Sequence, residues 1–118
     1  MRAAERLFNE GYYEDAISRA YYAIYHAARA ALASQNVLPK IHEGVVVEFG
    51  KRFVLSGVLP KDLGRILANA KASRETHEYS VTVTANKLEA EAILSDARTF
   101  VNKVREHLAE KESRGDNR

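Results

Sequence analysis

Residues 12–34 constrain the fold most strongly, because they contain neither glycine nor proline and repeat apolar side chains at helical spacing. Steps of three and four residues match the 3.6-residue period of an α-helix and do not match the alternation of a strand. The side chains that follow this spacing are Tyr13, Ala16, Ile17, Ala20, Tyr21, Ile24, Ala27, Ala28, Ala31 and Leu32. The stretch therefore predicts a long amphipathic helix whose apolar stripe has to be covered by other helices.

The remaining chain offers those covering helices, since only 2 prolines and 6 glycines occur in 118 residues. Apolar spacing predicts helices over about residues 2–9, 41–55, 60–78 and 85–107. Three consecutive valines in the segment 41–55 favour a strand, but the apolar residues of that segment recur every four positions. Residues 79–84 indicate a short extended connection, with Thr82 or Thr84 as the cap of the last helix. The pattern predicts an all-α protein, an antiparallel helical bundle of four main helices plus a short N-terminal helix.

Length and composition indicate a single globular domain, with 46% hydrophobic and 29% charged residues. We expect this domain to span residues 1–110 and residues 111–118 to form a polar, frayed C-terminal tail. No apolar run approaches the roughly 18 residues of a membrane span, and the first residues lack the apolar stretch of a signal peptide. We therefore expect a cytoplasmic protein.

Several classes of chemistry are excluded by residues that the chain lacks. Without cysteine there is no disulfide, no thiolate metal site and no cysteine nucleophile. A glycine-rich phosphate loop and a His-Glu-x-x-His motif are also missing. The histidines His26, His42, His77 and His107 fall on four different predicted helices, so we expect no metal site and no cofactor. The net charge of +2 is too small for a strongly basic nucleic-acid binder, so any phosphate site has to be local.

One candidate site lies at the end of the predicted helix 60–78. Arg74 and His77 are three residues apart, which places them on one helix face, and Tyr79 follows directly. Such a pair suits a phosphate, with arginine as the fixed charge and histidine as the proton donor or acceptor. The alternative is structural, with Arg74 paired to a neighbouring acid such as Glu75 or Glu78 and His77 as an ordinary helix-end residue.

A second candidate site lies on the outer face of the predicted helix 12–34. Its members recur at helical spacing and combine hydroxyl, cationic and aromatic groups: Ser18, Arg19, Tyr22 and His26, flanked by Tyr25 and Arg29. Tyrosine and arginine can stack on bases or bind phosphate. The alternative is a buried polar seam or a subunit interface, where the same residue types are favoured.

The string AISRAYYAIYHAARAAL at residues 16–32, preceded by Gly11, resembles the signature helix of HEPN domains. It is most similar to the small stand-alone branch known as UPF0332. Two later blocks resemble the same branch, Lys40-Ile41-His42 and the segment from Arg74 to Tyr79. The resemblance therefore covers nearly the whole chain.

This resemblance implies a helical bundle that forms homodimers and works with a minimal nucleotidyltransferase partner in a toxin–antitoxin-type system. Many relatives are metal-independent endoribonucleases with an Arg-x4-6-His motif, in which histidine moves a proton and arginine stabilises charge. In the present chain we expect Arg74 to stabilise charge, His77 to move the proton and Tyr79 to donate a hydrogen bond. The present chain departs from the motif, because only two residues separate Arg74 from His77. Non-catalytic nucleotide or RNA binding and a dimeric protein-interaction module therefore stay open as alternatives.

Overall fold

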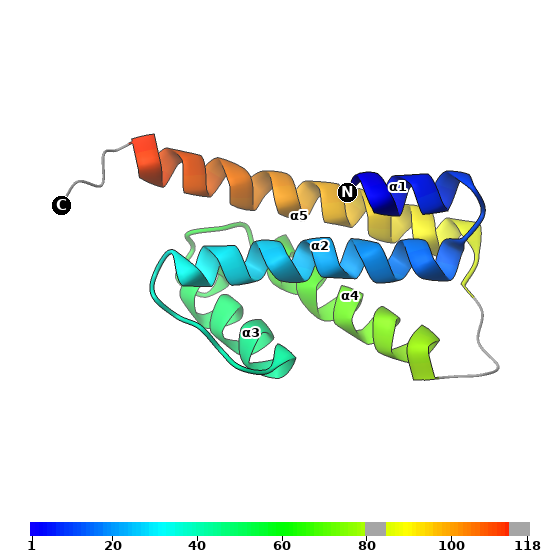
Figure 1. The fold of residues 1–118 in the computed structure, drawn as a ribbon. Coiled ribbons are helices and arrows are strands. Elements are labelled where there is room, and N and C mark those ends of the chain that lie inside the picture. Colours follow the sequence, from blue (N-terminus) through cyan, green and yellow to red (C-terminus); the bar gives the residue numbers. More distant parts are fainter. Residues whose placement is uncertain (80–84, 114–118) are drawn as a thin grey trace.

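The protein is described by a computed structural model over residues 1–79 and 85–113, and all of its regular elements are helical (Figure 1). The elements are α1 (Arg2–Asn9), α2 (Tyr13–Ala33), α3 (His42–Phe49), the π-helical segment η1 (Gly50–Val54), α4 (Asp62–Tyr79) and α5 (Lys87–Ser113). The described residues contain no strand. The prediction of an all-α bundle with four main helices and a short first helix is confirmed.

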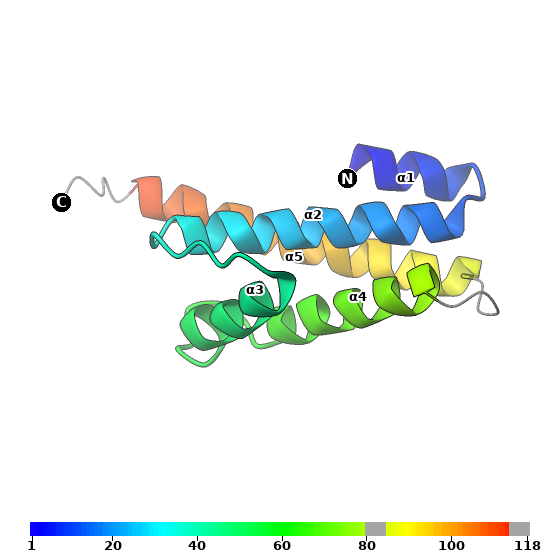
Figure 2. The same ribbon diagram turned by 60° about the horizontal axis from the view of Figure 1, so that its bottom comes forward.

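The long helix α2 lies at the centre of the bundle and packs against α1, α3, α4 and α5. α2 and α5 form a central pair, with α1 on one side of it and the hairpin of α3 and α4 on the other (Figures 1 and 2). The apolar stripe of α2 is buried as its spacing predicts, with Ile24 and Leu32 fully inaccessible to solvent. On α2 the side chains of Arg19, His26 and Arg29 remain exposed.

The segment predicted as one helix over 41–55 is divided into α3 and η1. Phe49 and Phe53 are both fully buried, their ring centroids are 5.2 Å apart, and Phe49 also lies 5.2 Å from Phe100 of α5. The π turn begins directly after Phe49, and η1 contacts α4. At the contact with α4, a Cβ on Gly64 would lie 3.2 Å from a methyl of Val54, so glycine permits this close approach.

The ends of the helices follow local chemistry. Gly11 ends α1 with a φ of +86°, and Gly57 follows η1 with a φ of +80°, both in the region that glycine adopts without strain. α5 is capped by Asn86, whose side-chain oxygen accepts the backbone N–H of Glu89 at 2.8 Å. The predicted caps Thr82 and Thr84 lie outside the described residues, and Asn86 takes that role.

The last helix is longer than its apolar pattern predicts. α5 continues to Ser113, past the domain boundary expected at residue 110, and residues 114–118 lie outside the described part of the chain. Lys111 donates a hydrogen bond to the backbone oxygen of Ser34 at 2.7 Å, which holds this last turn against the end of α2. Among the helices described, none has the length and apolar character that crossing a membrane requires.

Candidate functional site

Arg74 lies where α4 crosses the middle of α2. Its guanidinium carbon is 5.1 Å from the ring centroid of Tyr21 and 4.9 Å from that of Tyr22. Its Nη2 donates a hydrogen bond of 2.7 Å to the hydroxyl of Tyr22. A guanidinium between aromatic faces is held by attraction to both rings, and the hydrogen bond fixes its rotation. The predicted arginine is therefore anchored to the signature helix.

A histidine from α3 completes this arrangement on the other side of Tyr21. The hydroxyl of Tyr21 is hydrogen-bonded to Nδ1 of His42 at 3.1 Å, and the ring of Tyr25 lies 4.3 Å from the His42 ring. His42 is the first residue of α3 and is half-buried. The bond from Tyr21 fixes the orientation of the imidazole.

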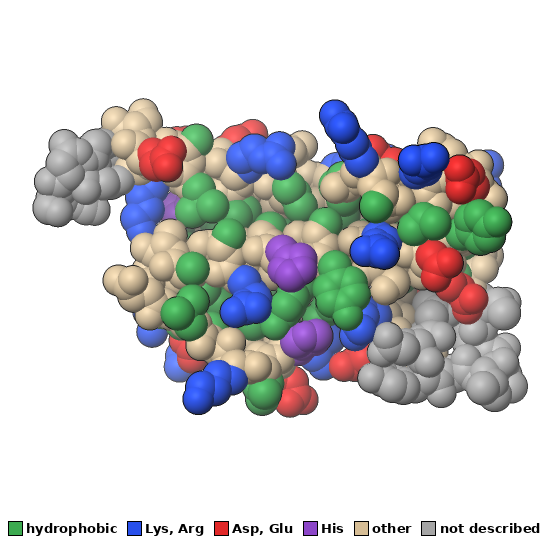
Figure 3. All heavy atoms as spheres, in the orientation of Figure 1, with side chains coloured by type: hydrophobic (Ala, Val, Ile, Leu, Met, Phe, Trp, Pro, Cys, Tyr) green, Lys and Arg blue, Asp and Glu red, His purple; other side chains and the backbone are tan. Residues whose placement is uncertain are grey.

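His26 extends the same group of rings toward solvent. Its ring lies 6.1 Å from Tyr22 in a nearly parallel arrangement and 5.7 Å from Tyr25. Tyr25 thus has a histidine on each side. We use the term arginine–tyrosine cluster for the set that α2, α3 and α4 bring together, Tyr21, Tyr22, Tyr25, His26, His42 and Arg74. Figure 3 shows the face of the molecule on which histidine, hydrophobic and basic side chains adjoin.

Burial governs the ionisation of Tyr21. Desolvation raises the pKa of its phenol from the ordinary value of 10.0 to about 12, although the positive charge of Arg74 acts in the opposite direction. The side chain is 1% exposed. Tyr21 therefore stays a neutral hydroxyl at physiological pH, and its role is to orient His42 and support Arg74 rather than to carry a charge.

The predicted ligand-binding residues lie in two adjoining surface depressions beside α1. The first, of about 450 Å³, is lined by Leu7, Asp15, Ser18, Arg19 and Tyr22. The second has a similar volume of about 450 Å³ and is lined by Met1, Ala3, Ala4, Arg19, Tyr22, Ala23 and His26. Both share Arg19 and Tyr22, so the structure brings Ser18, Arg19, Tyr22 and His26 together along one surface.

The other predicted residues are only partly described. His77 and Tyr79 lie in the last turn of α4, but their side chains lie outside the described part of the structure. On the helix backbone, Arg74 and His77 are almost one turn apart, as their spacing predicts. Of the two acids expected as alternative partners of Arg74, Glu75 accepts a hydrogen bond from Lys71 at 2.7 Å, and the side chain of Glu78 lies outside the described part of the structure.

Sequence reasoning missed the parts of the cluster that depend on tertiary packing. The helical spacing places Tyr25 on the polar face, but its side chain is only 6% exposed because His42 lies against it. The same spacing places Tyr21 in the apolar stripe and does not predict that its hydroxyl reaches His42. The available signal for His42 was its place in the Lys40-Ile41-His42 block.

The histidines do not assemble a metal site within the described residues. His26 and His42 meet around Tyr25, whereas His107 lies 5.7 Å from Phe53 at another part of the bundle. No group of three or more histidine, cysteine, aspartate or glutamate side chains lies close enough to hold a metal ion in the part of the chain that is described. The chemistry available at the cluster comes from arginine, tyrosine and histidine.

Comparisons with known proteins agree on one family. The HEPN domain profile matches residues 1–107. A Methanocaldococcus jannaschii protein named "Putative toxin" is 39% identical over 110 residues, which cover 93% of this chain and 81% of the relative. A second protein of that organism with the same name is 33% identical over 111 residues, which cover 94% of this chain and 76% of the relative. A UPF0332 protein of Gloeobacter violaceus is 29% identical over 111 residues, which cover 93% of this chain and 88% of the relative.

Proposed function

The chain belongs to the HEPN domain family, and from this premise we propose that it is the toxin-like member of a toxin–antitoxin-type pair. The names of the two relatives from Methanocaldococcus jannaschii support the toxin-like role. We propose RNA as its target and metal-independent cleavage of the phosphodiester as its reaction. The observation that carries this proposal is the placement of Arg74, held by Tyr22 between two rings at the junction of α2 and α4.

The proposed reaction is an internal transfer at phosphorus. The 2′-oxygen of the ribose attacks the adjacent phosphorus, the new O–P bond forms, and the bond to the 5′-oxygen of the next nucleotide breaks. His77 accepts the proton of the 2′-hydroxyl and returns a proton to the leaving 5′-oxygen. Arg74 stabilises the charge on the phosphate oxygens, and Tyr79 donates a hydrogen bond to them. The products carry a 2′,3′-cyclic phosphate and a 5′-hydroxyl.

A second candidate function is non-catalytic, either nucleotide or RNA binding or a dimeric protein-interaction module. It is favoured by the contacts of Arg74, since a guanidinium that stacks on two rings and donates to Tyr22 also ties α4 to α2. It is also favoured by the short spacing of Arg74 and His77, which departs from the ribonuclease motif. In this reading the cluster shapes a surface and carries out no chemistry.

RNA cleavage in the presence of a chelator separates the two candidates. Purified protein is incubated with total RNA and EDTA beside Arg74→Ala and His77→Ala, below the melting temperature of every variant. The control is Arg65→Ala, which removes an exposed arginine from the same helix. We expect wild type and the control to produce fragments with 2′,3′-cyclic phosphate ends, and the two site variants to produce none.

Each other outcome has a definite meaning. Full activity of both Arg74→Ala and His77→Ala would show that the site has been assigned to the wrong residues. The absence of cleavage by wild type would contradict the ribonuclease and favour the non-catalytic candidate. That candidate then predicts saturable binding of a nucleotide, weakened by Arg74→Ala and by rising salt.

We also propose that the protein acts as a homodimer in the cytoplasm with a minimal nucleotidyltransferase-like partner. Membership of the HEPN family supports this proposal, because the resemblance implies a homodimer that works with such a partner. Co-purification of a tagged chain with a nucleotidyltransferase encoded beside it, together with sedimentation equilibrium, tests the proposal. A strict monomer that retains no partner would contradict it.

A further inference from the structure

One stretch of the chain carries cations without any acid. Residues 16–42 include Arg19, Arg29 and Lys40 and contain no aspartate or glutamate, although the whole chain has a net charge of only +2. Arg19 and Arg29 are exposed on α2. Neither makes an ion pair with another described residue. Their charges are therefore available to an external anion.

The acids of the neighbouring helix do not cancel this charge. On α1 and its end, Glu5 is ion-paired with Arg98 of α5 at 2.9 Å, and Glu10 lies 3.7 Å from Arg6. The acid nearest along α2 is Asp15, which lines the first depression. The acid-free part of α2 accordingly begins beyond Asp15 and includes both Arg19 and Arg29.

The cations on α2 alternate with aromatic side chains on the same face. Arg19, Tyr22, His26 and Arg29 follow one another at steps of three, four and three residues, so they share one helix face. The two arginines are separated by about 15 Å along the helix axis. Figure 3 shows basic, histidine and hydrophobic side chains following one another across this face.

The aromatic members are held in place rather than loose. Tyr22 accepts the hydrogen bond from Arg74, and the His26 ring lies at 25° to the Tyr22 ring. Arg29 lies 5.9 Å from the ring centroid of Tyr25. The two depressions beside Tyr22 each have about 450 Å³. Volumes of several hundred Å³ accommodate a flat heterocycle with its sugar.

We propose that this surface, the α2 track formed by Arg19, Tyr22, His26 and Arg29, binds single-stranded RNA. The two arginines contact phosphates that are not adjacent in the strand, and Tyr22 and His26 stack on the unpaired bases between them. A duplex keeps its bases stacked on one another and cannot use the aromatic members. The inference rests on the proposed function, because the strand on the track passes Tyr22 and so brings a phosphodiester to Arg74.

The test measures binding without cleavage. The probe is a fluorescent 2′-O-methyl oligouridylate, which cannot be cleaved because it lacks the attacking 2′-hydroxyl. Its length of about twelve nucleotides lies within the range of site sizes known for proteins that bind single strands. Fluorescence anisotropy compares wild type with Arg19→Gln/Arg29→Gln, and with Arg65→Gln/Arg105→Gln, which removes two exposed arginines from α4 and α5. We expect the track variant to bind about tenfold more weakly and the control to bind like wild type.

Salt dependence and strand state give two further readouts. The magnitude of the slope of log affinity against log salt should fall by about 0.7 for each arginine removed from the track and stay unchanged in the control. A 2′-O-methyl duplex of matching length should bind more weakly than the single strand. Equal affinity of the track variant and wild type, or tighter binding of the duplex, would overturn the inference.

The binding experiment and the cleavage experiment can fail independently of each other. If natural RNA is cleaved by wild type and by the track variant alike, the ribonuclease stands and the track is wrong. If the oligonucleotide binds through the two arginines but natural RNA stays intact, the track stands and the cleavage proposal fails.

Discussion

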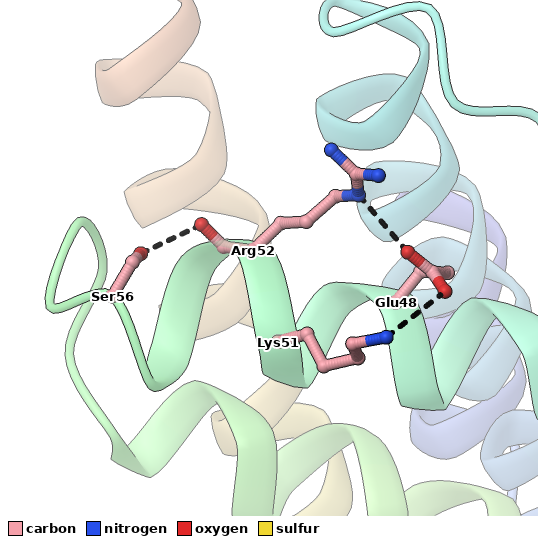
Figure 4. A network of polar contacts seen from close by, with 4 residues as sticks. All are labelled: Glu48, Lys51, Arg52 and Ser56. Carbon is pink, nitrogen blue, oxygen red and sulfur yellow. Dashed lines mark hydrogen bonds and ion pairs between the residues drawn. The ribbon is translucent and has the colours of Figure 1, made fainter.

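Arg74 and Arg52 make similar bonds in different settings. Arg74 of α4 donates to the hydroxyl of Tyr22 on α2 at 2.7 Å. Arg52 of η1 donates to the carboxylate of Glu48, one turn earlier, at 2.9 Å, while Lys51 lies 3.9 Å from the other oxygen (Figure 4). Arg52 is exposed, whereas Arg74 is half-buried between two tyrosine rings.

The comparison shows that bond length does not measure the importance of an arginine. The pair of Arg52 and Glu48 lies in solvent, where water and salt screen the attraction between the charges. The contacts of Arg74 join two helices in surroundings that exclude much of the water, where each polar contact has a larger effect. Changes around Arg74 should therefore alter stability and the site together, and changes around Arg52 should alter neither appreciably.

The largest expected effect is the removal of the ring beneath Arg74. Tyr21→Ala should lower the free energy of unfolding by about 3–5 kcal/mol, because a fully buried aromatic side chain leaves a cavity. Urea denaturation followed by circular dichroism measures this loss. Tyr21→Phe is the control, since it keeps the ring and removes only the bond to His42, for about 1 kcal/mol. Equal losses in both variants would mean that the hydroxyl, and not the ring, supports the cluster.

The direct contrast of the two arginines comes next in size. Arg74→Met keeps an unbranched apolar stem but removes the bond to Tyr22 and the attraction to both rings. It should lower the free energy of unfolding by about 1–2 kcal/mol. Arg52→Met, measured in the same urea titration, should leave the transition midpoint nearly unchanged. The comparison breaks down if Arg52→Met proves the more destabilising of the two.

Alkaline unfolding gives a smaller effect that isolates Tyr21. Its pKa is raised from 10.0 to about 12 in the folded state, so the unfolded chain loses this proton first. The stabilisation that it contributes is fully present below pH 10 and is lost as the pH rises through about 12. Between pH 10 and about pH 12, the free energy of unfolding should fall more steeply in wild type than in Tyr21→Phe, which lacks the titrating hydroxyl. Identical pH profiles would contradict the burial of this hydroxyl.

The fold was predictable where one segment alone specifies its own structure. The apolar spacing of residues 12–34 defines α2, and Gly11 marks the end of α1 through its positive φ. The π turn of η1 was not predictable, because Phe49 and Phe53 are four residues apart and point inward in either kind of helix. η1 also contacts α4, and this tertiary contact is not recorded in the local spacing of residues 41–55.

The same distinction applies to the candidate site. Arg19, Tyr22 and His26 were predicted to share a surface because they share one helix, and they line adjoining depressions. The contact of Tyr21 with His42 depends on the path of the chain between α2 and α3. That of Arg74 with Tyr22 depends on how α4 crosses α2. Both contacts join residues that are far apart in the sequence. The sequence therefore indicated which residues belong to the site but not which of them contact one another.

The smallest effect is expected at Glu48, and it completes the contrast with Arg74. The hydrogen bond from Arg52, helped by the charge of Lys51, holds the pKa of the Glu48 carboxyl below its ordinary value of 4.5. The stabilisation is therefore present above pH 4.5 and is lost as the pH falls through the lower folded value. Because the carboxylate is in solvent, Glu48→Gln should shift the melting temperature barely measurably at neutral pH and flatten the acid limb of the stability profile slightly. The control is Glu106→Gln, which removes an exposed carboxylate 3.9 Å from Lys103. A loss at Glu48 as large as that at Arg74 would mean that the exposed turn of η1, and not the arginine–tyrosine cluster, holds α3 and α4 in place.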